Sequence, residues 1–184
     1  MKKIALFFVV ASLALVNSGY ASCYPLDWKH LHEEADRISF TEALAAVKMK
    51  PDCIEELHVL ALTYLNTHKD KEAQDIFNRI LALKPDAQEA KWGLAEVLCR
   101  QHNLFKSEEI IKEVMKTNPD FPPPYLTLAY IKYMQLDFNE SVRLAYKIIE
   151  MGQGKVDHSN YVRAYVMLAG AKGIIAITAG RFLR

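Results

Sequence analysis

The chain has 184 residues, and its 51% hydrophobic and 24% charged side chains exclude a disordered or collagen-like protein. Its 23 basic residues are balanced by 22 acidic ones, which does not give the positive surface that nucleic-acid binders use. Three cysteines are too few for a disulfide scaffold, and none has the spacing of a zinc site. One folded domain is therefore expected, with no partner among nucleic acids.

The first residues predict export. Two lysines precede an uncharged apolar run from Ile4 to Val16, and small residues follow it. This is the pattern of a secretory signal peptide, and 13 apolar residues are fewer than the roughly 20 that span a bilayer. We expect residues 1–21 to be removed before Ser22 and the product to be periplasmic, with no integral membrane span.

A second interpretation of this segment stays open. Tyr20 to Cys23 is similar to a bacterial lipobox, in which Cys23 would become the lipidated first residue of an outer-membrane lipoprotein. A disulfide between Cys23 and Cys53 is the alternative, because the two cysteines flank an expected antiparallel helix pair. Lipid on Cys23 and this disulfide exclude each other.

A period of 34 residues organises the rest of the chain. The dipeptide Pro-Asp recurs at residues 51, 85 and 119, and Leu-Ala recurs at residues 60, 94 and 128. Two further columns share the period, and small residues in one of them allow two helices to approach closely. The small column is Ala73, Ser107 and Ser141, and the branched column is Ile80, Val114 and Ile148.

Apolar residues follow helical spacing twice in each period, which predicts two helices per repeat. The expected helices span residues 53–66, 70–83, 87–100, 104–117, 122–135 and 138–151. A shorter pair over residues 28–37 and 41–50 precedes them. Capping boxes are expected where an Asp or Ser stands three residues before a Glu. These candidates are Ser39, Asp52, Asp86 and Asp137.

These residues resemble the tetratricopeptide repeat family, which has two antiparallel helices in 34 residues and a proline at the boundary. The resemblance implies an all-α helix-hairpin solenoid forming a right-handed superhelix, with full repeats at 54–87, 88–121 and 122–155. Residues 22–53 would form an N-terminal capping pair. Lys91, Lys132 and Ala145 depart from the aromatic residues expected at their positions.

The last segment, residues 156–184, is expected to be an incomplete fourth repeat. Tyr165 to Ala169 repeats the pattern of Tyr125 to Ala129 after an enlarged loop. By this register a second helix would begin near Thr178 and continue beyond the last residue. We expect the apolar segment from Ile174 to Leu183 to be exposed and to promote self-association.

In this family the first helices of the repeats line a concave groove. Trp92 and Tyr130 lie outside the Leu-Ala columns, so both are expected to face it, although packing against neighbouring repeats is an open alternative. The resemblance implies a groove formed by Glu55, His58, Leu62, Asn66, Glu89, Trp92, Glu96, Cys99, Leu126, Tyr130, Tyr133 and Met134.

Other candidate chemistry is weak. The histidines are scattered, His30 and His32 are expected on the surface, and no catalytic triad or metal site is indicated by spacing. We therefore expect no catalysis and no cofactor, and an exported scaffold or adaptor that holds a protein or peptide in the groove. The alternative hypothesis is a periplasmic or lipid-anchored small-ligand component of a transporter that depends on a substrate-binding protein. A closed apolar channel would favour that alternative.

Overall fold

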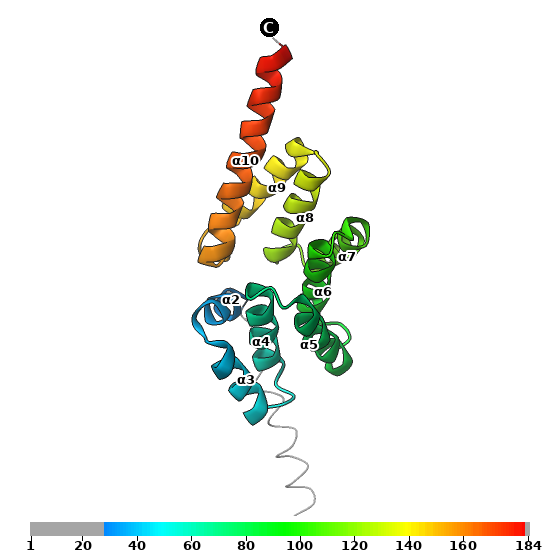
Figure 1. The fold of residues 1–184 in the computed structure, drawn as a ribbon, viewed down its shortest axis with the longest axis vertical. Helices are drawn as coiled ribbons and strands as arrows, with labels where there is room; N and C mark the ends of the chain where they lie inside the picture. The colour runs from blue at the N-terminus through cyan, green and yellow to red at the C-terminus, as the bar shows by residue number, and fades with distance from the viewer. Residues whose placement is uncertain (1–27, 183–184) are drawn as a thin grey trace, which may run out of the picture.

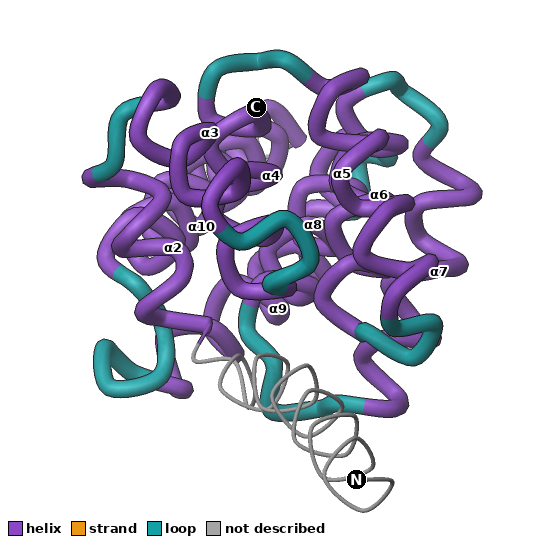
Figure 2. The backbone as a smooth tube through the Cα atoms, turned by 90° about the horizontal axis from the view of Figure 1, so that it is seen from below, coloured by secondary structure: helices purple, strands orange, loops and turns teal. Residues whose placement is uncertain are grey.

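The computed structural model describes the backbone of residues 28–182 and the side chains of residues 28–179. The expected signal peptide and Cys23 lie outside the described residues. Within them every regular element is an α-helix, as Figure 2 shows by its colours. The helices are α2 (Trp28–Arg37), α3 (Phe40–Met49), α4 (Ile54–Asn66), α5 (Asp70–Leu83), α6 (Gln88–Arg100), α7 (Leu104–Thr117), α8 (Pro123–Met134), α9 (Phe138–Met151) and α10 (His158–Phe182).

The all-α solenoid expected from the sequence is confirmed. Helices α4 and α5, α6 and α7, and α8 and α9 form three hairpins that follow one another along the molecule, and α10 packs on the last of them (Figure 1). Their bounds differ from the expected ones by no more than one residue.

The 34-residue columns form the interior of the solenoid. The alanines of the Leu-Ala pairs, the small column and the branched column are all buried, with exposed fractions of 0% or 1%. Ser107 remains satisfied there because its hydroxyl donates to the carbonyl oxygen of Ala95 at 2.7 Å. Leu60 and Leu128 are buried as well, whereas Leu94 is half-buried. The period thus marks the positions at which helices touch.

One interhelical contact requires a glycine. A Cβ atom placed on Gly93 of α6 would lie 2.3 Å from the ring of Phe77 on α5, closer than any real contact of this kind. Phe77 is fully buried, so its ring has no free space into which to move. The absence of a side chain at Gly93 lets these two repeats pack directly.

In the loops between repeats, two of the expected helix caps do not form. Each Pro-Asp dipeptide lies in a turn, and neither Asp52 nor Asp86 caps a helix; the residues at the N-caps are Cys53 and Ala87. Proline fixes the backbone for such a turn. The turns close through three backbone hydrogen bonds, from Cys53 to Lys50, Ala87 to Lys84 and Phe121 to Asn118.

Two of the expected caps do form. Ser39 accepts a hydrogen bond from the backbone of Glu42, whose side chain accepts one in return, so this capping box is confirmed. Asp137 accepts a hydrogen bond from the backbone of Glu140 at 3.2 Å.

The turns inside the repeats use residues with left-handed backbone. His68, His102 and Leu136 have φ angles of 57°, 63° and 66°, and they are spaced by the same 34 residues. Each follows the end of a first helix, where a left-handed residue ends the helix and glycine is usually preferred. His68 and His102 therefore hold turn positions, which accounts for two of the scattered histidines.

The first two helices are present at nearly the expected bounds, but they are not a hairpin like the later ones. Both α2 and α3 pack mainly against α4 and make little contact with each other. Leu31 and Ala35 bury one side of α2, and Ala43 and Val47 bury one side of α3. The two helices therefore cover different faces of α4.

The incomplete fourth repeat differs from expectation. Helix α10 continues without a break through Thr178, where a second helix was expected to begin. Ala169 is exposed, and the buried positions are Ala164 and Ala171, so Leu168 and Ala169 do not continue the packing column. The expected register is wrong because α10 packs mainly on the preceding hairpin and turns a different side towards it.

Leu136→Gly tests the left-handed turn. Glycine removes the steric cost of φ at 66°, so the free energy of unfolding should stay unchanged or rise by up to about 1 kcal/mol. Lys147→Gly, an exposed change inside α9, should lower it by about 1 kcal/mol. Urea unfolding measures both, and an equal loss in the two variants would contradict the turn assignment.

Candidate functional site on the concave face

The structure divides the twelve residues expected in the groove into two groups. Those buried inside the protein are His58, Leu62, Trp92, Glu96, Cys99 and Leu126. Those exposed or half-buried are Glu55, Asn66, Glu89, Tyr130, Tyr133 and Met134. The groove is therefore not open along the whole solenoid.

Helix α2 fills the part of the concave face formed by the first repeats. The ring of Trp28 lies 4.4 Å from that of Phe121 and packs edge-on to Trp92 and His58, at centroid distances of 6.4 and 5.5 Å. Asn66 also contacts α2 because its amide donates to Asp36 at 3.0 Å. The chain's own helix thus occupies the place where an external ligand was expected.

Trp92 was expected to offer an open binding surface, and this is wrong. It is only 4% exposed, and its indole nitrogen donates to the hydroxyl of Thr127 at 3.0 Å. Its neighbours Trp28 and Phe121 surround the ring. Truncation of Trp92 would therefore create a core cavity and destabilise the fold.

Two histidines lie in this aromatic cluster. His58 is fully buried between Trp28 and Phe77, and burial, together with the nearby His32, lowers its pKa to about 3. Burial likewise lowers the pKa of His32, which was expected on the surface but lies 5.6 Å from the ring of Trp92. Both are neutral packing residues at pH 7.

Glu96 joins three helices beside this cluster. It is 7% exposed and accepts a hydrogen bond from Thr127 of α8 at 2.7 Å. Arg100 of α6 lies 3.4 Å from the same carboxylate, and Arg163 of α10 lies 3.9 Å from it. A nearly buried carboxylate needs such partners, and here they connect α6, α8 and α10.

The two arginines differ in how fully they are engaged. Arg100 also donates to the carbonyl of Leu65 at 2.7 Å and pairs with Asp70 at 3.3 Å, which fixes it to the first repeat. Arg163 donates to Asn160 at 3.2 Å, and its side chain is 54% exposed. Arg163 is therefore the guanidinium that a ligand could reach.

An open pocket of about 200 Å³ lies on the concave face between α6, α8 and α10. It is lined by Glu96, Cys99, Arg100, His102, Thr127, Tyr130 and Arg163. Tyr130 is 39% exposed at this pocket, and Met134 follows one turn later on α8 with 41% exposed. The site therefore combines a carboxylate and two guanidinium groups with an exposed aromatic ring.

A second, smaller pocket shows how the concave face is closed. Its volume is about 30 Å³, and its lining includes His32 and Asp36 of α2 together with Ser159 and Arg163 of α10. Figure 1 shows the beginning of α10 next to α2. The two end helices of the described chain thus meet across the face.

The two described cysteines have different states. Cys99 is free and 3% exposed, and burial together with Glu96 raises the pKa of its thiol to about 12, so it is not a nucleophile at neutral pH. Cys53 is disulfide-bonded. Cys23, the partner expected from the sequence, lies outside the described residues. Among the described residues no cluster of three His, Cys, Asp or Glu side chains could hold a metal.

The sequence did not identify Arg100, Thr127 and Arg163 as site residues. Arg100 stands one turn after Glu96, a spacing that predicts a helical ion pair and could have drawn attention to it. Arg163 comes from a helix whose register was wrong, and no local signal places it beside Glu96. The predicted groove residues that the structure brings to the pocket are Glu96, Cys99 and Tyr130.

Comparisons with known proteins agree with this architecture. The tetratricopeptide repeat family matches residues 71–130, which run from α5 into α8. Residues 71–130 of this chain therefore contain tetratricopeptide repeats. Its repeats extend beyond the matched segment, because the hairpin of α8 and α9 keeps the same columns to Ile148.

Two solved structures share the solenoid fold with this repeat protein. The MamA protein superposes with a TM-score of 0.51 and 17% identity, over 78% of this chain and 76% of MamA. A tetratricopeptide repeat protein from Parabacteroides merdae superposes with a TM-score of 0.51 and 20% identity, over 77% of this chain and 57% of that one. No curated protein matches the sequence. The likeness is therefore one of fold.

His58 predicts a pH dependence. Because its pKa is about 3 in the folded state and 6.5 when unfolded, the unfolded chain binds a proton first as the pH falls. Stability should be full above about pH 6.5 and fall towards pH 3, by up to about 1.4 kcal/mol per pH unit from this group. Urea unfolding at several pH values measures the slope.

The variant His58→Leu should reduce this slope while remaining folded at pH 8, and His32 and Glu108 contribute to the part that persists. An unchanged slope in folded His58→Leu would show that His58 does not contribute to acid unfolding.

Proposed function

We propose that this repeat protein is a scaffold that binds a segment of another protein at the pocket between α6, α8 and α10. Tetratricopeptide repeat proteins generally bind protein partners, and the family match covers α6 and the first part of α8, which form two walls of this pocket. The pocket is a part of the concave face that α2 does not fill, and this observation carries the proposal.

The lining defines the partner's chemistry. Tyr130 and Met134 provide apolar contact area on α8, and Arg163 provides donors at the opposite wall. Glu96 is already engaged by Thr127 and Arg100, so the accessible charge is mainly that of the guanidinium. An extended segment with an apolar side chain next to a carboxylate matches this surface.

The alternative of a small apolar ligand receives less support. A closed apolar channel would have favoured that hypothesis. Instead, charged side chains line both pockets, and α2 fills the aromatic interior. Three of the seven residues that line the larger pocket are charged, whereas small-molecule sites typically have only a few polar groups. Protein binding is therefore the function that we propose.

A double variant tests the site. Tyr130→Ala with Arg163→Ala removes one aromatic anchor and one accessible cation, and binding should weaken by about 2 kcal/mol or more. The measurement is recovery of partners from a native extract, identified by mass spectrometry and then titrated as purified segments.

The matched control is Phe105→Ala. Phe105 is 82% exposed on α7 and does not line either pocket, so partner recovery should be unchanged. Thermal melts confirm that each variant is folded. If the folded double variant and the control recover equal amounts of partner, the partner does not bind at this pocket.

We also propose that the protein is exported, and that the signal peptide is cleaved before Ser22. Export to an oxidising compartment is consistent with a disulfide at Cys53. Intact mass of the protein purified from cells should correspond to a chain that begins at Ser22. A mass that includes diacylglycerol on Cys23 would instead establish the lipoprotein, and an uncleaved chain would contradict export through this signal.

A further inference from the structure

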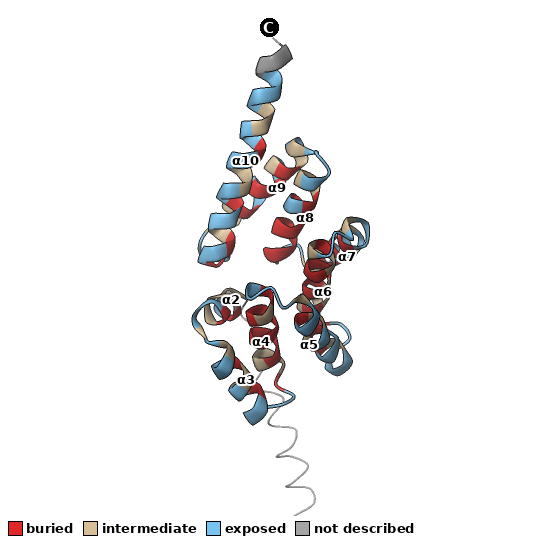
Figure 3. Ribbon diagram, viewed as in Figure 1, coloured by how far each residue is buried: buried red, intermediate tan, exposed pale blue. Residues whose placement is uncertain are grey.

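Helix α10 has one uncovered side along its whole described length. It packs on α9 and α8 through Ala164 and Ala171, which are fully buried. On the other side Val166 is 67% exposed and Ile177 is 60% exposed. Figure 3 shows this helix as mostly exposed, and Figure 1 shows it extending past α8 and α9.

The composition of α10 makes this exposure unusual. Residues 158–179 are long and apolar enough to cross a membrane, yet only 11% of that segment is buried in the protein. A single helix that passes this test is weak evidence for a membrane span. Contiguous apolar surface of this kind marks a binding face in a water-soluble protein.

The uncovered side, which we call the outer face of α10, has a regular pattern. From Val162 to Ala176 its residues are separated alternately by four and three positions, the spacing that lines one side of a helix, and Ile177 lies four positions after Gly173. The outer face consists of Val162, Val166, Ala169, Gly173, Ala176 and Ile177. Large side chains stand towards its ends and small ones near its middle.

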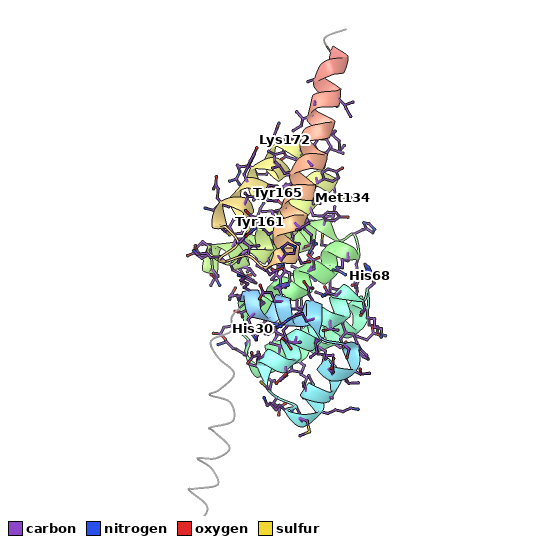
Figure 4. All side chains as sticks on the ribbon, turned by 90° about the vertical axis from the view of Figure 1, so that its left-hand side faces the viewer. His30, His68, Met134, Tyr161, Tyr165 and Lys172 are labelled. Carbon is purple, nitrogen blue, oxygen red and sulfur yellow. The ribbon has the colours of Figure 1, made fainter. Side chains whose placement is uncertain are left out.

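The outer face carries no charge because both nearby cations point back to the protein. Arg163 donates to Asn160 and approaches Glu96. Lys172 donates to the hydroxyl of Tyr146 on α9 and lies over its ring, 4.8 Å from the centroid; Figure 4 labels Lys172 on α10. Each cation therefore stands on a flank of the helix, outside the outer face.

We propose that the outer face of α10 is the interface of a homodimer, in which it pairs antiparallel with the same face of a second copy. A two-fold axis brings a surface against itself, so a charged face would repel its own copy. The outer face has no charge between residues 162 and 177, which makes it compatible with such pairing.

The side-chain sizes select the antiparallel register. With the axis between Ala169 and Gly170, Val166 of one copy stands opposite Gly173 of the other, and Val162 stands opposite Ile177. Large side chains then meet small ones in the middle of the interface, as close helix packing requires. This proposal does not depend on the pocket or its partner.

A lipid bilayer fits the same helix less well. A spanning α10 would place Lys172 and Arg163 inside the membrane, where charges are costly. Lys172 is tied to α9, so α9 and its exposed charges, among them Glu150, would have to enter with it. Small residues such as Ala169 and Gly173 also give little apolar contact to lipid, whereas they allow two helices to approach closely.

Sedimentation of the purified protein tests the dimer over about a hundredfold concentration range. The unmodified protein should be dimeric. Val166→Asp should be monomeric, because it places two carboxylates in the interface near the two-fold axis. Phe105→Asp makes the same kind of change at an exposed site on α7 and should remain dimeric. Circular dichroism confirms that all three are folded.

Cysteine cross-linking tests the register. Ala169→Cys should form a disulfide between two copies, and Ile177→Cys should cross-link with Val162→Cys but not with itself. Efficient self-cross-linking of Ile177→Cys would indicate parallel helices and overturn this register. A folded protein that is monomeric throughout overturns the dimer. If that monomer floats with phosphatidylcholine and phosphatidylglycerol vesicles and Val166→Asp does not, the outer face binds lipid instead.

Discussion

The packing of Trp28 against Phe121 determines what the concave face can do. A ring from the first described helix lies 4.4 Å from a ring that precedes α8, across the first two repeats of the solenoid. Trp92 and His58 complete the cluster from α6 and α4. Because these rings exclude water from the same side that normally receives a ligand, the aromatic residues stabilise the fold, and the more polar end of the face stays accessible.

The repeat period explains why the helices could be predicted and the cluster could not. Small residues such as Ala73 and branched residues such as Ile80 contact their neighbours inside one or two adjacent repeats, so their spacing is visible in the sequence. Trp28 contacts residues that lie far along the chain and belongs to no repeat. Trp92 has the spacing of a groove residue whether the groove is open or filled. Its burial depends in part on Trp28 of α2, which belongs to no repeat.

The same distinction applies to the candidate site. Tyr130 and Glu96 were predicted from the register of the first helices, and both line the larger pocket. Arg163 was missed because α10 leaves the 34-residue register, and its place beside Glu96 depends on how that helix docks on α8 and α9. The expected caps failed for a local reason, since Asp52 and Asp86 belong to proline turns and form ion pairs with Arg79 and Lys84 instead.

Departures from the repeat pattern also have physical explanations. Lys91 and Lys132 stand where aromatic residues are usual, and both form ion pairs with α7, to Glu113 at 3.0 Å and Glu108 at 2.6 Å. Burial opposes ionisation of Glu108, but hydrogen bonds from Lys112, Lys132 and Gln135 lower its pKa to about 2. At these two positions, ion pairs near the surface of the hairpins take the place of aromatic packing.

Tryptophan fluorescence tests the central claim that α2 fills the concave face. The chain has two tryptophans, so the variant Trp28→Phe makes Trp92 the sole reporter while keeping an aromatic ring in α2. If α2 covers Trp92, its emission should be blue-shifted and protected from acrylamide, and unfolding in urea should remove both properties together. Red-shifted emission that acrylamide quenches freely in the folded variant would show an open groove and would contradict the account.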